Sequence, residues 1–355
     1  MMDRVSGLRL AVSFIFFLLF ATIPARDALA GAADKRLDVY WIDVEGGAAT
    51  LIVTPAGESI LVDAGNPGGR DAGRIHRVAA EVAGLARIDH LVVTHYHVDH
   101  FGGVAELTAL MPVLALYENG IDSAPDQERN DPRLEAYRKA PVGRRLIVQP
   151  GMEISLRGAK GAERPRLRFL GGRQRFVTSK AARPNQAVCQ DLTEKEADTS
   201  DNANSVVMVL EHGGFRLFDA GDLTWNVEGR LVCPVDRVGT VDVYQSTHHG
   251  LDRSNNPVIV RTLQPTVVVF NNGPRKGADP DALAAVRSSP SVKAVYQVHR
   301  NVREGALNTI DSRIANREES CAGEFIKMSV DPEGGSYSLR VPSTGYSEAY
   351  KTRHR

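Results

Sequence analysis

Three histidines and one aspartate lie within six residues, in the segment Thr94-His95-Tyr96-His97-Val98-Asp99-His100. The segment follows the run Leu91-Val92-Val93, which is short, apolar and β-branched and therefore predicts a buried strand. Open α/β sheets bind ligands at the carboxyl ends of their strands, which is where this loop lies. Imidazole and carboxylate groups together suit zinc, manganese or iron better than calcium or magnesium. The loop therefore predicts a site for one or two divalent metal ions, with zinc as the first expectation and manganese or iron as alternatives.

The first 30 residues have the pattern of a secretory signal peptide. Arg4 and Arg9 precede an apolar run over residues 10–23, and Ala28-Leu29-Ala30 provides a small-residue cleavage site. The run of about fourteen residues is shorter than the ~20 needed to span a bilayer. An uncleaved membrane anchor is the alternative. We expect an exported protein, periplasmic or extracellular, with no stable membrane insertion after cleavage.

The overall charge is balanced, with 43 basic and 43 acidic residues. Bulk charge therefore predicts neither a nucleic-acid nor a membrane partner. An exported protein can oxidise one pair of its three cysteines. Cys189 with Cys321 is the expected pair, which leaves Cys233 free, and three free thiols are the alternative.

The order of expected elements predicts the fold class. Strands are expected over residues 37–44, 48–53 and 59–62, followed by a helix over 71–85 with Asp71 as its N-cap. After the metal loop come a helix at 103–110 and a strand at 113–116. A second hairpin at 205–218 is followed by further strand and helix alternations, and an antiparallel pair at 325–341 ends the chain. This order favours two packed sheets with helices outside, a single four-layered α/β domain over residues 31–355. The polar stretch around residues 173–204 is expected to be an ordered insertion or a mobile loop.

A pair of metal ions needs more ligands than the loop supplies, and further candidates follow other expected strands. Asp222 follows Gly221, and a carboxylate there can bridge two metals, although a helix N-cap is the alternative. His248 and His249 follow the strand near residues 241–244, and they point in different directions because they are adjacent. Asn272 ends another strand and can line the pocket. His299 lies in a similar position, where a surface histidine is an equal alternative.

These residues match a known family. The loop, with Asp63 upstream and Asp222 and His248 downstream, resembles the metallo-β-lactamase superfamily, over residues 37–298. Shorter motifs are similar to the hydrolase domain of the DNA-uptake competence protein ComEC, a branch that includes secreted phosphocholine esterases. These motifs are Ile42-Asp43-Val44-Glu45-Gly46-Gly47, Asn202-Ala203-Asn204-Ser205, Gly221-Asp222 and His248-His249-Gly250.

The resemblance implies an αββα sandwich with the site at one edge of the two sheets. It assigns His95 and His97 to a first metal, Asp99 and His100 to a second, and Asp222 to both. His248 would complete the second metal and His249 would contact substrate, with their exchange left open. Asp63 would orient a ligand imidazole by accepting its other N–H.

The sequence departs from the family at one ligand. Many members place another histidine on the first metal, between the loop and the Asp222 position. The one histidine in that interval is His212, which is expected in a hairpin turn away from the other ligands. The first metal would then be underligated, or completed by water, Asn202 or Asn204.

The expected chemistry is hydrolysis by a metal-bound hydroxide, with Asp99 orienting the nucleophile and His249 donating to an oxyanion or leaving group. The branch implies a phosphodiester substrate, either nucleic acid or phosphocholine-like. Nine basic residues between Arg157 and Arg183 can follow a polyanion or form a solvated face. The alternatives are a β-lactamase or lactonase, which the missing histidine disfavours, and a non-catalytic binding module, which the intact ligand set disfavours.

Overall fold

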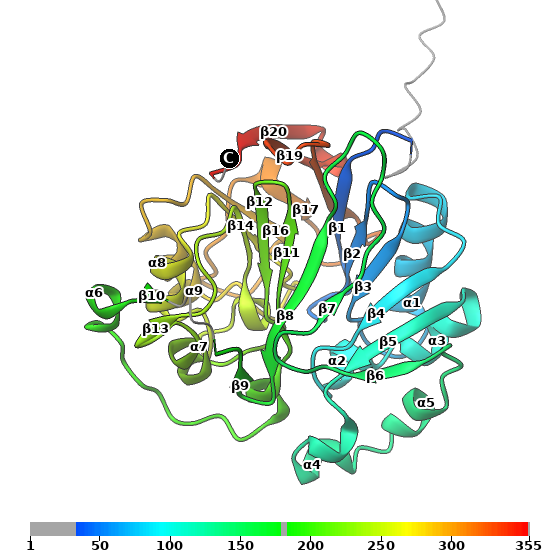
Figure 1. Ribbon diagram of the computed structural model, residues 1–355, viewed down its shortest axis with the longest axis horizontal. Coiled ribbons are helices and arrows are strands. Elements are labelled where there is room, and N and C mark those ends of the chain that lie inside the picture. The colour runs from blue at the N-terminus through cyan, green and yellow to red at the C-terminus, as the bar shows by residue number, and fades with distance from the viewer. Residues whose placement is uncertain (1–32, 179–182, 354–355) are drawn as a thin grey trace, which may run out of the picture.

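The computed structural model describes residues 33–178 and 183–353, and Figure 1 shows two large β-sheets lying face to face with helices on their outer sides. The predicted signal peptide lies outside the described residues. Among the residues described, no helix combines the length and apolar character needed to cross a membrane. The layer order is helix, sheet, sheet, helix, which confirms the predicted αββα class.

The first sheet has nine strands in the order β20-β19-β18-β1-β2-β3-β4-β5-β6. Strands β1 to β3 are joined as antiparallel hairpins, whereas β3, β4, β5 and β6 run parallel. The bounds are β1 Leu37–Ile42, β2 Thr50–Val53, β3 Ser59–Val62, β4 Ile88–Val92, β5 Val113–Glu118, β6 Arg145–Ile147, β18 Phe325–Val330, β19 Ser336–Val341 and β20 Tyr346–Lys351.

The second sheet has the order β17-β16-β15-β14-β12-β11-β8-β7, with β9 paired to β8. Strands β12, β14, β15, β16 and β17 are parallel neighbours. The bounds are β7 Glu153–Ile154, β8 Arg166–Gly172, β9 Arg175–Phe176, β11 Val207–His212, β12 Phe215–Asp219, β14 Val243–Gln245, β15 Val267–Phe270, β16 Ala294–His299 and β17 Ile314–Asn316, beside a separate pair of β10 Arg183–Pro184 and β13 Val235–Asp236.

Helices on one outer face cover the first sheet and those on the other cover the second (Figure 1). The first group is α1 Arg70–His76, α2 Val98–Phe101, α3 Val104–Leu110, α4 Asp126–Arg129 and α5 Leu134–Lys139. The second is α6 Gln186–Cys189, α7 Trp225–Val232, α8 Pro257–Leu263 and α9 Pro280–Arg287.

Alternating side chains of β1 show why the sheets pack on both faces. Leu37, Val39 and Trp41 join the core between the two sheets, while Tyr40 and Ile42 join the core under α1 and α3. Successive side chains of a strand point to opposite faces, so an apolar residue at nearly every position fits a strand buried on both sides. The two cores bring the carboxyl ends of β3, β4, β12 and β14 to one edge.

Two local predictions need correction. The helix predicted over residues 71–85 is α1 followed by a π-helical turn, Arg77–Val82. Asp71 is not its N-cap, because the Asp71 carboxylate instead accepts the backbone N–H of Asn66, at 2.7 Å.

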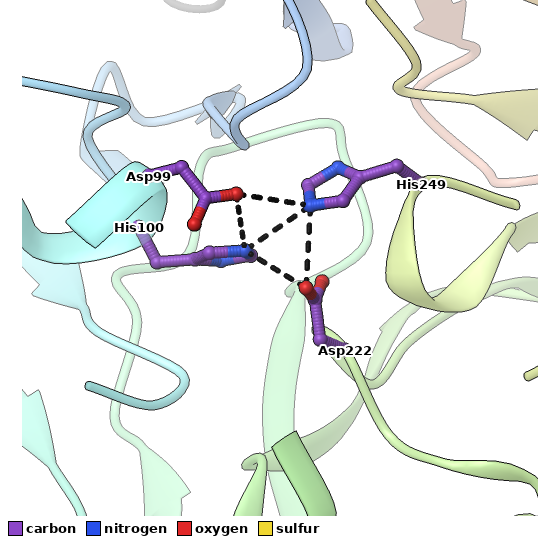
Figure 2. Close-up of side chains that lie close together, drawn as sticks. All are labelled: Asp99, His100, Asp222 and His249. Atoms are coloured by element: carbon purple, nitrogen blue, oxygen red, sulfur yellow. Dashed lines mark hydrogen bonds and ion pairs between the residues drawn. The ribbon is translucent and has the colours of Figure 1, made fainter. Parts of the chain in front are cut away.

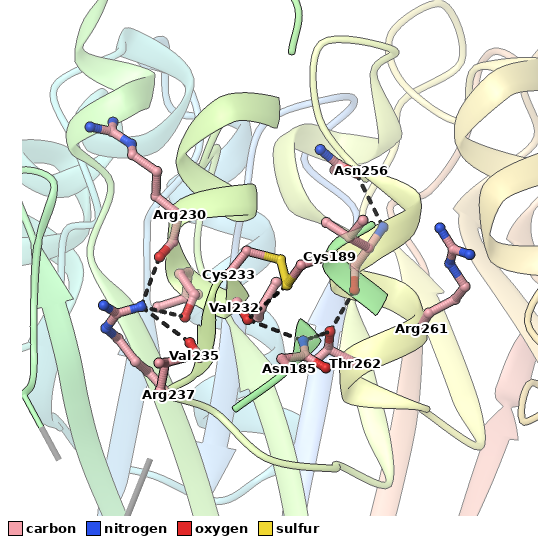
Figure 3. The surroundings of a disulfide bond; sticks show 12 residues. Asn185, Cys189, Arg230, Val232, Cys233, Val235, Arg237, Asn256, Arg261 and Thr262 are labelled. Atoms are coloured by element: carbon pink, nitrogen blue, oxygen red, sulfur yellow. Dashed lines mark hydrogen bonds between the residues drawn. A yellow bond between two sulfur atoms is a disulfide. The ribbon is translucent and has the colours of Figure 1, made fainter. Parts of the chain in front are cut away.

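The pairing of Cys189 with Cys321 was also wrong, because Cys189 is bonded to Cys233 (Figure 3). The Cα atoms of this pair are 5.7 Å apart, which suits a disulfide. The disulfide joins α6, in the predicted insertion, to the end of α7 on the outer face of the second sheet. The insertion contains β9, β10 and α6 among its described residues.

Candidate metal centre

The metal loop begins where β4 ends, and α2 begins within it. Asp63, at the end of the neighbouring parallel strand β3, holds this loop in place. One Asp63 oxygen accepts the backbone N–H of Thr94 at 2.8 Å, and the other lies 2.8 Å from the Thr94 hydroxyl and 2.7 Å from Nδ1 of His100. Because a carboxylate fixes Nδ1–H, the Nε2 atom of His100 is left to face the centre.

Asp222 and the two adjacent histidines come from the second sheet. Gly221 precedes Asp222 with φ +51, and a Cβ at that glycine would lie 2.7 Å from the Thr94 hydroxyl oxygen. The chain can therefore approach the metal loop only with glycine at this position. His248 and His249 follow β14 with φ +52 and +54, a left-handed pair rare for residues with a side chain. Such backbone strain concentrates at functional sites.

Asp99, His100, Asp222 and His249 form one cluster (Figure 2), with one ligand atom from each within 4.8 Å of all the others. The Nε2 atoms of His100 and His249 each lie 3.2 Å from Oδ2 of Asp222. Oδ2 of Asp99 lies 3.3 Å from Nε2 of His249 and 3.5 Å from that of His100. Two imidazole nitrogens and two carboxylate oxygens at these separations are a donor set that fits one divalent ion.

The structure places His249, rather than His248, in the cluster with Asp99, His100 and Asp222. Nδ1 of His249 lies 3.2 Å from the carbonyl oxygen of Asn271, which turns its Nε2 into the cluster. His248 lies beside the cluster, with Nε2 3.6 Å from Oδ2 of Asp222 and 3.3 Å from Nδ2 of Asn202. The left-handed backbone of the pair determines which ring faces the carboxylates.

His95 and His97 lie next to the cluster, with the His95 ring centroid 4.2 Å from that of His100. Among the described residues, Nε2 of His95 is buried without a hydrogen-bond partner and lies 3.9 Å from Oδ2 of Asp222, whose Oδ1 also has none. His97 packs its ring against His95, with ring centroids 4.8 Å apart, but its Nε2 lies 3.2 Å from Glu128. The unpartnered atoms of His95 and Asp222 are donors that fit a second ion, whereas His97 is turned to Glu128.

Mutual charge sets the protonation of these groups. Burial alone would raise the pKa of Asp222, but the imidazoles of His100, His249 and His248 hold it well below its usual value. Burial would lower the pKa of His100, but Asp222, Asp63 and Asp99 raise it well above the usual value. Burial lowers the pKa of His95 well below normal and that of His248 to about 4. Neutral imidazoles and ionised carboxylates are the forms that bind metals, so an ion bound at this cluster would have to displace the proton of His100.

Several predicted residues lie away from the cluster. The Asn204 side chain donates to Asp201 at 2.9 Å, and the Asn272 side chain donates to the carbonyl oxygen of His299 at 2.7 Å. His299 joins a different group, Asp43 and Cys321. His212 faces the carbonyl oxygen of Asp331 at 3.1 Å, away from the ligands as expected.

Some residues of the site had no signal in the sequence. Lys276, in the loop after β15, places its ammonium group against Oδ2 of Asp99. Glu228 of α7 accepts the backbone N–H groups of Asn255 and Asn256, at 2.9 and 2.7 Å, and contacts the Thr247 hydroxyl, so it holds the loop that carries His248. Each comes from a different element, and single residues of this kind are recognised only once the fold is known.

A cleft of about 600 Å³ opens beside the centre. The insertion supplies one wall, residues 195–200, and Thr224, Trp225, Asn226 and Arg253 supply the rest. The ammonium of Lys195 lies 3.8 Å from the centre of the Trp225 ring. Thr224 follows Asp222 by two residues and Arg253 adjoins Ser254, a partner of His248, so the cleft lies near the centre, although no residue of the four-residue cluster lines it.

Comparison with known proteins agrees with this architecture. The family model of the metallo-beta-lactamase superfamily matches residues 42–158. A UPF0173 metal-dependent hydrolase of Polynucleobacter asymbioticus is 35% identical over 82 residues, spanning 23% of this chain and 27% of that protein. A UPF0173 metal-dependent hydrolase of Cupriavidus necator is 24% identical over 281 residues, spanning 77% of this chain and 86% of that protein.

Solved structures with a similar chain course include Zn²⁺-bound PqqB from Methylobacterium extorquens. It is 14% identical, with 73% of this chain and 97% of that chain covered and a TM-score of 0.41. The diiron β-hydroxylase CmlA from Streptomyces venezuelae is 17% identical, with 73% and 48% covered and a TM-score of 0.36.

The αββα layers and the cluster of imidazoles and carboxylates at their edge define a metal-dependent hydrolase of the metallo-β-lactamase fold. Its metal loop lies within residues 42–158, the segment that matches the family model of the metallo-beta-lactamase superfamily.

Proposed function

We propose that the protein is an exported phosphodiesterase of the ComEC-like branch of the superfamily. The observation that carries the hydrolytic assignment is the convergence of Asp99, His100, Asp222 and His249 within 4.8 Å. These four residues would hold a divalent ion, which would supply activation of a water molecule and stabilisation of negative charge on the attacked group.

The chain's own residues add positive charge at the mouth of the centre. Lys276 lies against Asp99 and is partly exposed, and Arg253 and Lys195 line the adjoining cleft. A phosphodiester carries a negative charge through ground state and transition state, so cations positioned beside the ligands favour it over a neutral lactam or lactone. Asp99, fixed between Lys276 and His249, is placed to orient the attacking water.

Several basic residues between positions 157 and 183 are paired with carboxylates, which favours a small phosphodiester over a nucleic acid as the substrate. Arg166 pairs with Glu153 at 3.0 Å, Arg157 with Glu58 at 3.6 Å and Arg168 with Glu211 at 3.9 Å. Guanidinium groups paired with carboxylates offer a polyanion much less attraction than unpaired ones. The cleft, with the aromatic ring of Trp225 beside cations, has the composition to hold a compact phosphate ester.

Export is supported by two independent features. The apolar run and Ala28-Leu29-Ala30 site follow the pattern of a signal peptide. The bond between Cys189 and Cys233 is of the kind that persists in oxidising compartments. Both point to the periplasm or the exterior of the cell.

The test is hydrolysis by purified metal-loaded protein of bis-p-nitrophenyl phosphate, single-stranded DNA and nitrocefin. The proposal expects the first to be hydrolysed and the activity to be lost in Asp222→Ala. Asp281→Asn, an exposed acid on α9, serves as the control and should retain full activity. Turnover of nitrocefin without turnover of any phosphodiester would overturn the assignment.

A further inference from the structure

We propose a second, separate metal site, formed by Asp43, His299 and Cys321, that binds one transition-metal ion such as Zn²⁺ or Co²⁺. One ligand atom of each residue lies within 4.8 Å of the others. Asp43 follows β1, His299 ends β16, and Cys321 lies in the loop between β17 and β18. Three segments distant in sequence therefore bring an oxygen, a nitrogen and a sulfur ligand to one place.

His299 is already arranged as a metal ligand. Its Nδ1 lies 2.9 Å from the carbonyl oxygen of Arg300, and a carbonyl can only accept, so Nδ1 carries the proton. Nε2 therefore has a free lone pair, yet it is fully buried and has no hydrogen-bond partner among the described residues. A backbone carbonyl that fixes the opposite nitrogen is the usual support of a metal-binding imidazole. A buried, unpartnered nitrogen costs stability unless a ligand occupies it.

Cys321 and Asp43 supply the remaining two ligands. The Cys321 thiol lies 3.0 Å from Oδ2 of Asp43, which is fully buried. Burial raises the pKa of the thiol to about 11, so the metal-free group is protonated. Metal binding forms an S–metal bond and releases that proton to solvent, as thiolate ligation requires. Cys321 is the one free cysteine, since Cys189 and Cys233 are bonded to each other.

The surrounding charge agrees with such a site. Arg74 places Nη1 3.3 Å from Oδ2 of Asp43 and Nη2 3.1 Å from the carbonyl oxygen of Cys321. A divalent ion adds two charges to a carboxylate, a thiolate and this guanidinium, which leaves a total of only about one positive charge. Sulfur and nitrogen ligands select zinc or cobalt over magnesium and calcium, and three protein ligands leave one tetrahedral position to water.

The site is distinct from the main centre. It shares no ligand with the cluster of Asp99, His100, Asp222 and His249. Its ligand set includes a thiol, and theirs does not. An ion bound there would join β1, β16 and the loop before β18, and would so stabilise the first sheet against the second.

Cobalt distinguishes the two sites, because a thiolate bound to Co²⁺ gives a sulfur-to-metal charge-transfer absorption in the near ultraviolet. The full-length protein, stripped of metal and kept free of oxygen, is titrated with Co²⁺ alone. The band should grow to one equivalent, persist in Asp222→Ala, and be absent from Cys321→Ser and His299→Gln. No band in the wild type, or a band that survives in His299→Gln, would overturn the proposal.

Alkylation of the wild-type thiol provides a second measurement that does not depend on the variants folding. Zn²⁺ should slow the reaction of Cys321 with iodoacetamide at least about tenfold, since a metal-bound thiolate is withdrawn from attack. Magnesium should have no effect. Equal rates with and without zinc would contradict the site. Phosphodiester hydrolysis in Cys321→Ser is expected to remain at the wild-type level, so this proposal and the proposed function can fail independently.

Discussion

His100 and His249 approach Asp222 from opposite sheets, and each places Nε2 3.2 Å from the same carboxylate oxygen. His100 belongs to α2, beside the first sheet, and His249 follows β14 of the second. The metal centre therefore forms only when the two sheets are packed together, which links metal binding to the folded state.

The two adjacent histidines should differ in effect. His249→Ala removes a nitrogen from the four-residue cluster and should lower the metal content together with activity. His248→Ala should retain the metal of that cluster and lower kcat, because His248 lies beside Asp222 without joining the cluster. Metal analysis and steady-state kinetics of both variants check this, with His76→Ala on α1 as the control. If His248→Ala lost the metal and His249→Ala retained it, His248 would be the metal ligand and His249 the substrate contact.

Asp63 should control metal affinity without touching the ion. Asp63→Ala leaves Nδ1 of His100 and the Thr94 N–H without their acceptor. Loss of such a supporting carboxylate typically costs about 10–100-fold in metal affinity or activity. Competition with a chelator measures the affinity, and Asp63→Asn should recover part of it through the remaining oxygen. Unchanged affinity in Asp63→Ala would show that His100 does not need this partner.

Lys276 should contribute to recognition of a negatively charged substrate. Lys276→Ala removes the cation beside Asp99 and should lower kcat/KM for a phosphodiester by about tenfold, the value of one charge-assisted contact of about 1.4 kcal/mol. Lys276→Arg should retain more activity than the alanine variant, and Lys139→Ala, an exposed lysine on α5, should show no change. An effect equally large on a neutral ester would exclude a role in charge recognition.

The disulfide should stabilise the wall of the cleft. It closes a loop of sequence separation 44, and the loop includes residues 195–200 of the cleft. The paired variant Cys189→Ser, Cys233→Ser should lose about 2–4 kcal/mol of unfolding free energy. Chemical denaturation measures this loss, and KM should rise more than kcat falls. A variant as stable as the wild type would indicate that packing of α6 on α8 already holds the insertion.

Glu228 should give the protein a distinctive pH dependence of stability. Burial raises the pKa of this carboxyl from 4.5 to about 7 in the fold. Between these values the unfolded chain releases the proton while the folded chain retains it, so stability falls as pH rises. The loss amounts to about 3 kcal/mol between pH 4.5 and 7. Denaturation at several pH values should show this extra slope in the wild type and its absence in Glu228→Gln, and equal slopes would contradict it.

The sequence predicted the fold well because its signals are local. The apolar runs that became β1 to β4 and the second hairpin follow a period of two or a fully buried pattern, and the αββα order follows from their succession. Helix α7 and strands β17 and β20 were not predicted. β17 has three residues and β20 alternates exposed and partly buried positions, so packing rather than pattern determines them.

The sequence did not predict those features of the site that depend on tertiary contacts. The loop His95–His100 and the Gly221-Asp222 turn are recognisable by spacing, but the choice between His248 and His249 depends on two left-handed residues. The partner of Cys189 and the place of Lys276 depend on which segments meet across the second sheet. A local sequence pattern does not encode which distant segments come into contact.

The most direct test of the account is the metal content and phosphodiester activity of Asp222→Asn beside the wild type. Asp222 lies within 4 Å of His95, His100, His248 and His249, so its charge holds the centre together. The account predicts that the wild type binds at least one divalent ion, and that the variant folds but loses both the ion and the hydrolysis of bis-p-nitrophenyl phosphate. A variant that retains the ion and wild-type turnover would contradict it.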